Sequence, residues 1–151
     1  MKIDGIKIKL TELKSTDNYQ TFLNLLKELS TIDIDQIPYE DYLKHLQLIQ
    51  QNPLHKIYVA KINDKIIGTI TLFIEPKFIH NLSYVGHIED VVVDKQYRGI
   101  GLGSFLLKKV IKNAYDNNCY KVILDCSNKN IAFYEKNGFK QKENHMVKYY
   151  D

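Results

Sequence analysis

The chain has 151 residues, of which 21 are basic and 18 acidic, so its formal net charge is +3 at pH 7. This length fits one domain, and fractions of 44% hydrophobic and 26% charged residues are those of an ordinary soluble globular protein. So small a charge does not favour a nucleic-acid partner, and no apolar stretch reaches the roughly 18 residues of a membrane span. One residue stands out, because Arg98 is the single arginine.

The N-terminal third predicts one strand and two helices. Residues 5–10 alternate apolar and polar side chains, as a half-buried strand does. The Ser-Thr-Asp run at 15–17 supplies helix-capping residue types before a first helix. The apolar face of that helix consists of Phe22, Leu25, Leu26 and Leu29. A polar loop over 30–36 then leads to a second amphipathic helix over 38–49, with a proline at its start.

The middle of the chain predicts three strands over 56–62, 65–74 and 86–94. Asn-Asp at 63–64 is a tight-turn sequence, so the first two strands form a hairpin. We expect all three to make an antiparallel meander. The connection over 75–85 is longer than a hairpin turn requires, which makes it a candidate functional loop.

After residue 94 the pattern changes to alternating helices and strands. Apolar spacing predicts a helix over 102–115, a buried strand over 120–126 and a short helix over 130–137 that ends at Gly138. A weaker terminal strand is expected over 139–150. A meander followed by β-α-β elements predicts an α+β domain, with one mixed, twisted sheet and helices on both faces. We expect residues 1–151 to form this single domain.

The cysteines and histidines do not form a metal-site pattern. Cys119 and Cys126 lie seven residues apart without a CxxC pair, so we expect two buried free thiols. The five histidines show no ligand spacing, and no metal site is expected. The N-terminus lacks the apolar core of a signal peptide, so a cytoplasmic location is expected.

The most informative segment is Arg-Gly-Ile-Gly-Leu-Gly at 98–103, between a predicted strand and a predicted helix. Glycines at alternate positions allow positive φ and a close approach of the backbone to a ligand. Loop amides and the helix N-terminus together favour an anion such as phosphate or pyrophosphate. A Walker A loop needs GxxxxGK[ST] and a dinucleotide fingerprint needs GxGxxG, and the segment fits neither. A glycine-rich turn without any ligand remains the structural alternative.

The same segment resembles the Gln/Arg-x-x-Gly-x-Gly/Ala motif of the GNAT acetyltransferase superfamily, whose loop amides bind the pyrophosphate of acetyl-CoA. Residues 130–139, from Asn130 through Tyr134 to Gly-Phe, resemble a second element of that superfamily. Gly-His-Ile-Glu-Asp-Val-Val-Val at 86–93 and the run ending in Leu-Asp-Cys at 126 are similar to one subfamily, the glucosamine-6-phosphate N-acetyltransferases. Acetyl-CoA as co-substrate, glucosamine 6-phosphate as acceptor and a homodimer are what this resemblance implies.

The resemblance also implies site residues. Cofactor binding is expected of Val91, Val92, Val93, Arg98, Gly99, Ile100, Gly101, Leu102, Gly103, Ser104, Asn130, Phe133 and Tyr134. Tyr134 is the candidate general acid beside the CoA sulfur, because a phenol stays protonated at neutral pH and can donate to a thiolate. Glu89 is the candidate acceptor of the amine proton, directly or through water, and Asp125 is a candidate catalytic residue that contacts the substrate. No single base is chosen, because an amine that binds in its neutral form needs none. Neighbours on a strand point to opposite faces, so Asp90 is expected to act through its backbone.

Substrate binding is expected of Ser30, Lys77, His80, Glu89, Asp90, Tyr120, Lys121, Asp125 and Lys148. Lys77 and His80 belong to a loop that resembles the subfamily's substrate loop. Lys148 stands where the subfamily usually has an arginine, and an ammonium lacks the two-pronged guanidinium geometry for phosphate. Two alternatives stay open: a GNAT enzyme for another small amine or a protein N-terminus, and a CoA-binding module without catalysis.

Overall fold

The structure is a computed structural model that describes residues 1–3 and 5–150. Its strands are β1 Lys2–Ile3, β2 Ile6–Lys7, β3 Lys9–Glu12, β4 His55–Ile62, β5 Lys65–Pro76, β6 Tyr84–Val93 and β7 Cys119–Ile123. Its α-helices are α1 Tyr19–Leu26, α2 Tyr39–Gln50, α3 Ile79–Leu82, α4 Leu102–Asp116 and α5 Ile131–Lys136. Short 3-10 turns lie at Ile34–Gln36, Lys95–Tyr97 and Asn128–Asn130.

A mixed sheet forms the centre of the molecule, with the strand order β3-β4-β5-β6-β7 in the described residues. Strands β3 to β6 pair antiparallel, which confirms the predicted meander, and β7 pairs parallel with β6. The hairpin between β4 and β5 turns at residues 63–64, where Asn63 has a φ of 51°. Parallel neighbours need a crossover, and here α4 supplies it between β6 and β7.

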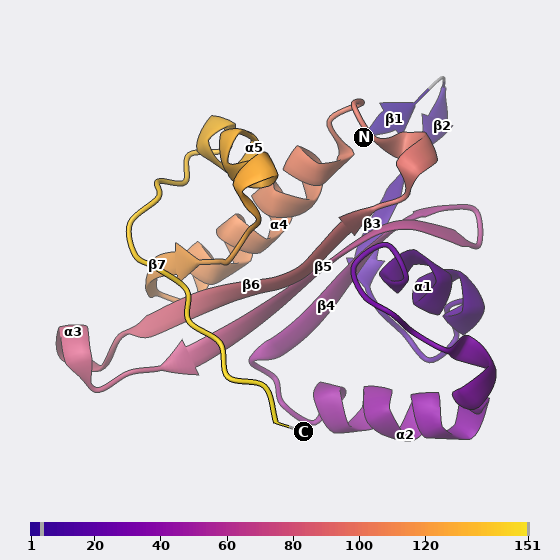
Figure 1. Ribbon diagram of the computed structural model, residues 1–151, viewed down its shortest axis with the longest axis horizontal. Coiled ribbons are helices and arrows are strands. Elements are labelled where there is room, and N and C mark those ends of the chain that lie inside the picture. Colours follow the sequence, from indigo (N-terminus) through magenta and orange to yellow (C-terminus); the bar gives the residue numbers. More distant parts are fainter. Residues whose placement is uncertain (4, 151) are drawn as a thin grey trace.

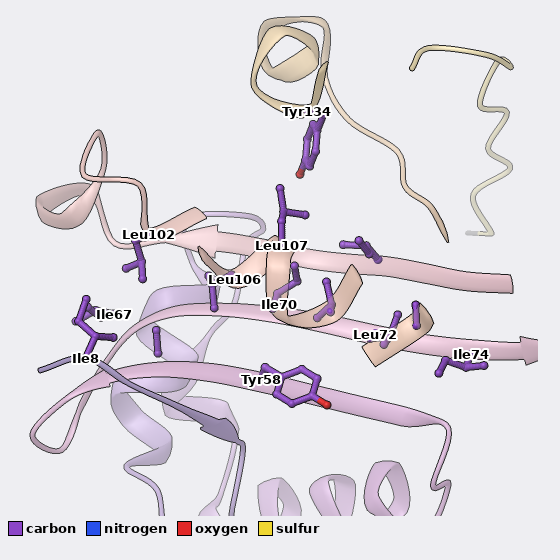
Figure 2. Close-up of a cluster of buried hydrophobic side chains, with 14 residues drawn as sticks. Ile8, Tyr58, Ile67, Ile70, Leu72, Ile74, Leu102, Leu106, Leu107 and Tyr134 are labelled. Carbon is purple, nitrogen blue, oxygen red and sulfur yellow. The ribbon is translucent and has the colours of Figure 1, made fainter. Parts of the chain in front are cut away.

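Helices cover both faces of this sheet, as expected (Figure 1). On one face α4 buries Leu106 and Leu107 completely, against Ile70 and Leu72 of β5 (Figure 2). On the other face α1 and α2 pack over a second apolar cluster built from their own residues and from β4 and β5. The continuous burial of residues 66–72 in β5 follows from this arrangement, because a strand covered on both faces buries side chains of both faces.

The first helix begins later and ends earlier than the sequence predicts. Its N-cap is Asn18, and residues 15–17 precede the helix. The helix stops at Leu26, so Leu29 lies outside it with 47% of its surface exposed. Asp17, counted among the caps, instead accepts a hydrogen bond from the backbone N–H of Lys14 and forms an ion pair with Lys61. These contacts hold Asp17 in the turn before the helix.

Asn18→Ala is expected to destabilise the protein by about 1 kcal/mol, which is typical of removing a helix cap. The Asn18 side-chain oxygen accepts a hydrogen bond from the Thr21 backbone N–H over 3.1 Å, and alanine would leave that N–H without this partner. Urea unfolding followed by circular dichroism measures the change. Asn18→Ser, which keeps a capping oxygen, should recover most of the loss, and equal losses in both variants would contradict the capping role.

The C-terminal part departs from the predicted strands. Strand β7 covers Cys119–Ile123 alone and is mostly exposed, instead of a buried strand over 120–126. It is an edge strand that packs against α4, and its side chains at Tyr120, Lys121 and Ile123 are exposed. Residues 139–150 form no strand and lie mostly exposed. No helix in the described part of the chain is long and apolar enough to cross a membrane.

Candidate active site

A cleft opens where the two parallel strands diverge. The pairing of β6 with β7 ends at His87 and Ile123, whereas β6 continues to Val93. The resulting cleft has a volume of about 1050 Å³, and its walls are the second half of β6, the glycine loop, residues 125–130 and α5.

The glycine loop brings the N-terminus of α4 to the cleft. Gly99 and Gly101 have φ angles of 78° and 85°, in the left-handed region that other residues adopt only with strain. Gly101 caps α4 without any side-chain hydrogen bond, and the first turn of α4 contains no acidic residue. The first amides of this 15-residue helix are therefore free to bind an anion, and the helix dipole favours negative charge there.

The third glycine of the motif has a different role. A Cβ built on Gly103 would lie 3.0 Å from Cζ of Phe133, so a side chain at 103 would displace the aromatic ring. Gly103 thus allows α5 to pack directly against the first turn of α4. That contact positions Tyr134, which is the next residue of α5.

The guanidinium of Arg98 makes two contacts within the protein, and these contacts hold the loop in place. Its Nε donates to the carbonyl oxygen of Val93 over 2.9 Å, and its Nη2 donates to Oε2 of Glu28 over 3.1 Å. Lys95 Nζ lies 3.2 Å from the same carboxylate. The guanidinium thus bonds to a backbone carbonyl at the end of β6 and to a carboxylate of the protein itself.

Arg98→Lys is expected to raise the KM for the nucleotide cofactor about fivefold while kcat changes little. One ammonium cannot replace two donors aimed at Val93 and Glu28, and a half-exposed hydrogen-bonded pair of this kind contributes about 1 kcal/mol. Initial-rate kinetics at varied cofactor concentration measure the effect. Glu28→Gln should reproduce part of it, and an unchanged KM in both variants would contradict the positioning role.

A β-bulge lies in β6 at the floor of the cleft. Thr69 pairs with Val92 and Thr71 with Glu89, so two residues of β6, Asp90 and Val91, face one residue of β5. Asp90 has a φ of 51°, which breaks the regular alternation. Both residues contribute atoms to the cleft, and Asp90 also lines a second pocket beneath α1 and α2, so the expectation that their side chains point to opposite faces stays a prediction. A bulge also turns backbone groups out of the ladder.

The acceptor side of the cleft is acidic. Partial desolvation raises the pKa of Glu89, and the nearby carboxylates of Asp90 and Asp125 raise it further. Asp125 follows β7, and its Oδ2 lies 2.8 Å from Nδ1 of His145 in the C-terminal segment. Three carboxylates around one opening attract a cationic amine, and a raised pKa suits Glu89 to accept a proton.

Tyr134 closes the inner end of the cleft. Its side chain is 8% exposed, and its ring lies between Phe133 and Phe139 at centroid distances of 5.0 and 5.8 Å. Figure 2 shows the ring directed from α5 toward β6, with its oxygen at the lower end. Burial raises the pKa of Tyr134, and the neighbouring Cys126 raises it further. The phenol thus keeps its proton at neutral pH.

The structure divides the predicted site residues into two groups. The cleft brings together Ser30, Glu89, Asp90, Val91, Val92, Val93, Arg98, Gly99, Gly101, Leu102, Gly103, Ser104, Asp125, Asn130, Phe133 and Tyr134. The other predicted residues do not line the cleft: Lys77, His80, Ile100, Tyr120, Lys121 and Lys148. His80 and Tyr120 stack at a centroid distance of 4.0 Å, with Lys121 Nζ 5.6 Å from the Tyr120 ring centroid. We call Lys77, His80, Tyr120 and Lys121 the tip cluster.

Several residues of the cleft were not predicted from the sequence. The most informative are the lysines Lys95, Lys129 and Lys136, which add positive charge around the glycine loop. Lys129 precedes the Asn130–Phe139 element and Lys136 lies within it, so cations at a segment already expected to bind the cofactor were an available signal. Cys126, which was expected to be buried, is exposed and lines the cleft together with Glu28. Nothing in the sequence pattern separated these two from other surface residues.

An anion-binding helix start, a tyrosine proton donor and a group of carboxylates share one cleft in a mixed sheet. This is the arrangement of an acyltransferase that takes its acyl group from a nucleotide thioester. Residues 19–139 match the model of the Acetyltransferase (GNAT) family, and the chain belongs to that family.

Individual relatives agree with this assignment over most of the chain. Glucosamine 6-phosphate N-acetyltransferase of Candida albicans is 39% identical over 138 residues, which cover 90% of this chain and 91% of that protein. The crystal structure of glucosamine-6-phosphate N-acetyltransferase from Arabidopsis thaliana superposes with a TM-score of 0.90 at 36% identity, covering 96% and 99% of the two chains. An acetyltransferase structure from Trypanosoma brucei gives a TM-score of 0.88 at 34% identity, covering 95% and 100%. The GNAT fold expected from the sequence is confirmed.

Proposed function

We propose that the protein transfers the acetyl group of acetyl-CoA to the amine of glucosamine 6-phosphate, forming N-acetylglucosamine 6-phosphate. The observation that carries this proposal is the cleft, which joins a pyrophosphate-type anion site to a proton donor and a group of carboxylates. The names of the relatives in Candida albicans and Arabidopsis thaliana support the same acceptor.

Acetyl-CoA lies along the second half of β6 in this proposal. The edge of β6 beyond His87 has no β7 partner, so the backbone of Val91–Val93 is available to pair with the pantetheine arm. The pyrophosphate binds the amides at the start of α4, and Lys129 and Lys136 add charge at the same wall. Asn130 and Phe133 flank the arm on the α5 side.

The reaction is a direct attack of the amine on the thioester. Glu89 accepts a proton from the amine, and Asp125 binds the sugar beside it. A backbone amide at the bulge near Val91 donates to the carbonyl oxygen as negative charge develops there. Tyr134 donates its proton to the leaving thiolate and regains one from solvent. No covalent intermediate with the protein is required, because the nucleophile is the substrate's own amine.

A homodimer would bring the tip cluster to the cleft of a second copy. The segment between β5 and β6 exposes Phe78, Ile79 and Leu82 by 93, 60 and 68%. His80 and its two successors have φ angles from 53° to 60°, a left-handed turn that is costly for ordinary residues. An exposed apolar tip of this kind is typical of a contact surface. In the dimer, Lys77 and Lys121 supply cations for the sugar phosphate, His80 supplies a hydrogen bond, and Lys148 contributes from the C-terminal segment.

We further propose that residues 1–151 form one acetyltransferase domain and that the enzyme is cytoplasmic. The family match over 19–139 and the shared core beneath β4 to β7 support one domain. Two thiols without a disulfide between them are typical of a reducing compartment.

A substrate panel tests the proposed function. Release of free CoA thiol is followed with acetyl-CoA and, in parallel, glucosamine 6-phosphate, glucosamine and a set of peptides. The expected result is turnover with glucosamine 6-phosphate and a kcat/KM at least about tenfold lower with glucosamine, because one charge-assisted phosphate contact contributes about 1.4 kcal/mol or more. Equal kcat/KM values with and without the phosphate would contradict the proposal. Turnover of peptides alone would assign the enzyme to a different acceptor.

A further inference from the structure

A second cavity lies beneath α1 and α2, with a volume of about 200 Å³. Most of its wall consists of apolar side chains from the two helices and from β4: Phe22, Leu23, Leu26, Leu46, Ile49 and Ile57. Thr69 and Thr71 of β5 and Asp90 of β6 make the rest of the wall more polar. An apolar cavity of about 150 Å³ holds a benzene ring. The cavity is therefore large enough for one compact apolar group.

Asp90 connects this cavity with the cleft, because it is the one described residue that lines both. Burial lowers the pKa of His55, and the Asp90 carboxylate opposes that shift. His55 lies two residues before Ile57 on β4, so the two side chains share a face of the sheet. Ile57 belongs to the cavity wall. The charge of Asp90 is thus felt on the face that α1 and α2 cover.

The carboxylate of Asp90 has no counter-ion among the described residues, unlike its neighbours. Asp125, the other aspartate of the cleft, pairs with His145. Asp94, which follows β6, pairs with Lys65. The described residues that line the cavity include no lysine or arginine. An unpaired negative charge beside an apolar cavity is complementary to an ammonium group on a compact apolar body.

We propose that the cavity beneath α1 and α2 is a second ligand site, which binds a compact apolar ammonium ion and weakens the binding of the acceptor amine through Asp90. The apolar group of the ligand packs against α1 and α2, and its ammonium group lies at Asp90. Binding in the cavity is independent of the proposed function. The effect on the acceptor rests on the proposed use of glucosamine 6-phosphate.

The ligand acts through charge, without occupying the cleft. Glu89, Asp90 and Asp125 together attract the acceptor amine, and an ammonium bound from the cavity side neutralises one of these three charges. The charge of Asp90 also reaches the proposed base, because desolvation and then the Asp90 carboxylate raise the pKa of Glu89. Two coupled sites change each other's affinity by a fixed factor. We therefore expect the KM for glucosamine 6-phosphate to rise about fivefold and then to level off as ligand is added.

Benzylamine is the probe, and the full-length protein is used throughout. Amide NMR signals of Ile57 and Thr71 should shift saturably, with a Kd of about 1 mM or tighter. Initial rates at varied glucosamine 6-phosphate then give KM at each benzylamine concentration. Benzyl alcohol has the same ring without the charge, so it should bind more weakly and leave KM unchanged. A KM that rises without limit, or acetylation of benzylamine itself, would place the probe in the cleft and overturn the inference.

Two variants at one position complete the test. Ile49 is half-buried in α2 and lines the cavity but not the cleft. Ile49→Phe fills the cavity, so it should abolish both the NMR shifts and the rise in KM while its own KM and kcat stay at parent values. Ile49→Leu keeps the volume and should respond like the parent. An undiminished response in Ile49→Phe, or an equal effect of benzyl alcohol on KM, would contradict the proposed site.

The outcomes also separate this inference from the proposed function. If the protein turns over glucosamine 6-phosphate and benzylamine causes no saturable shift, the inference alone fails. If glucosamine 6-phosphate is not turned over, the proposed function fails, and the NMR titration still decides whether the cavity binds the ammonium ion.

Discussion

Tyr134→Phe is expected to lower kcat by about 10²-fold or more with little change in the KM for acetyl-CoA, which is the range for loss of a general acid. The substitution removes one oxygen and keeps the ring between Phe133 and Phe139, so the packing of α5 is preserved. Without the phenol, the thiolate must leave unprotonated or take its proton from water. Thiol release at saturating concentrations of both substrates measures the change.

The pH dependence separates proton donation from packing. Burial and Cys126 raise the pKa of Tyr134 above its ordinary value, so the acid form persists to high pH. If Tyr134 is the acid, kcat of the parent enzyme falls only at strongly alkaline pH, where the phenol ionises, and this alkaline limb disappears in Tyr134→Phe. A variant with unchanged kcat would remove Tyr134 from the mechanism. A variant with a raised KM and an unchanged pH profile would assign it to cofactor binding.

The fold was predictable where local pattern and burial agree. Strand β5 and helix α4 lie in the interior, so the apolar period of their sequences matches what they contact, and their predicted positions were confirmed. The C-terminal elements are different, because β7 is an edge strand and residues 139–150 are mostly exposed. Ile123 and Val147 look like strand residues in the sequence, yet they are 39% and 60% exposed. The periodicity of a sequence predicts which face of a strand is apolar, but not whether another element of the chain covers that face.

In the candidate site, too, some features were predictable from the local sequence and others were not. The loop at 98–103 carries its geometry in its glycines, so an anion site was predictable from the sequence alone. The bulge at Asp90 was not predictable from the sequence. It arises from the pairing of β6 with β5, whose register the sequence does not specify. The separation of the tip cluster from the cleft was equally hidden. Lys77 and Glu89 are twelve residues apart in sequence, but Lys77 precedes β6 and does not line the cleft, whereas Glu89 lies in the second half of β6 and does.

Glu89→Gln is expected to lower kcat by about 10²-fold near neutral pH, because the amide keeps the size of the side chain but cannot accept a proton. The sign of the pH effect follows from the role. A base acts in its ionised form, so kcat of the parent enzyme falls tenfold per pH unit below the pKa of Glu89 in the bound complex. Since that pKa is raised, the acid limb lies at higher pH than an ordinary glutamate would give. The limb should vanish in the variant.

Asp125→Asn provides the matched control for that prediction. The Asp125 carboxylate is one of the charges that raise the pKa of Glu89, so removing it should move the acid limb of kcat to lower pH. The same variant should raise the KM for the amino sugar, because it loses a charged contact with the substrate. If Asp125 were itself the base, Asp125→Asn would abolish the limb and Glu89→Gln would leave it in place. The two profiles, measured together, therefore distinguish the two carboxylates that the sequence could not separate.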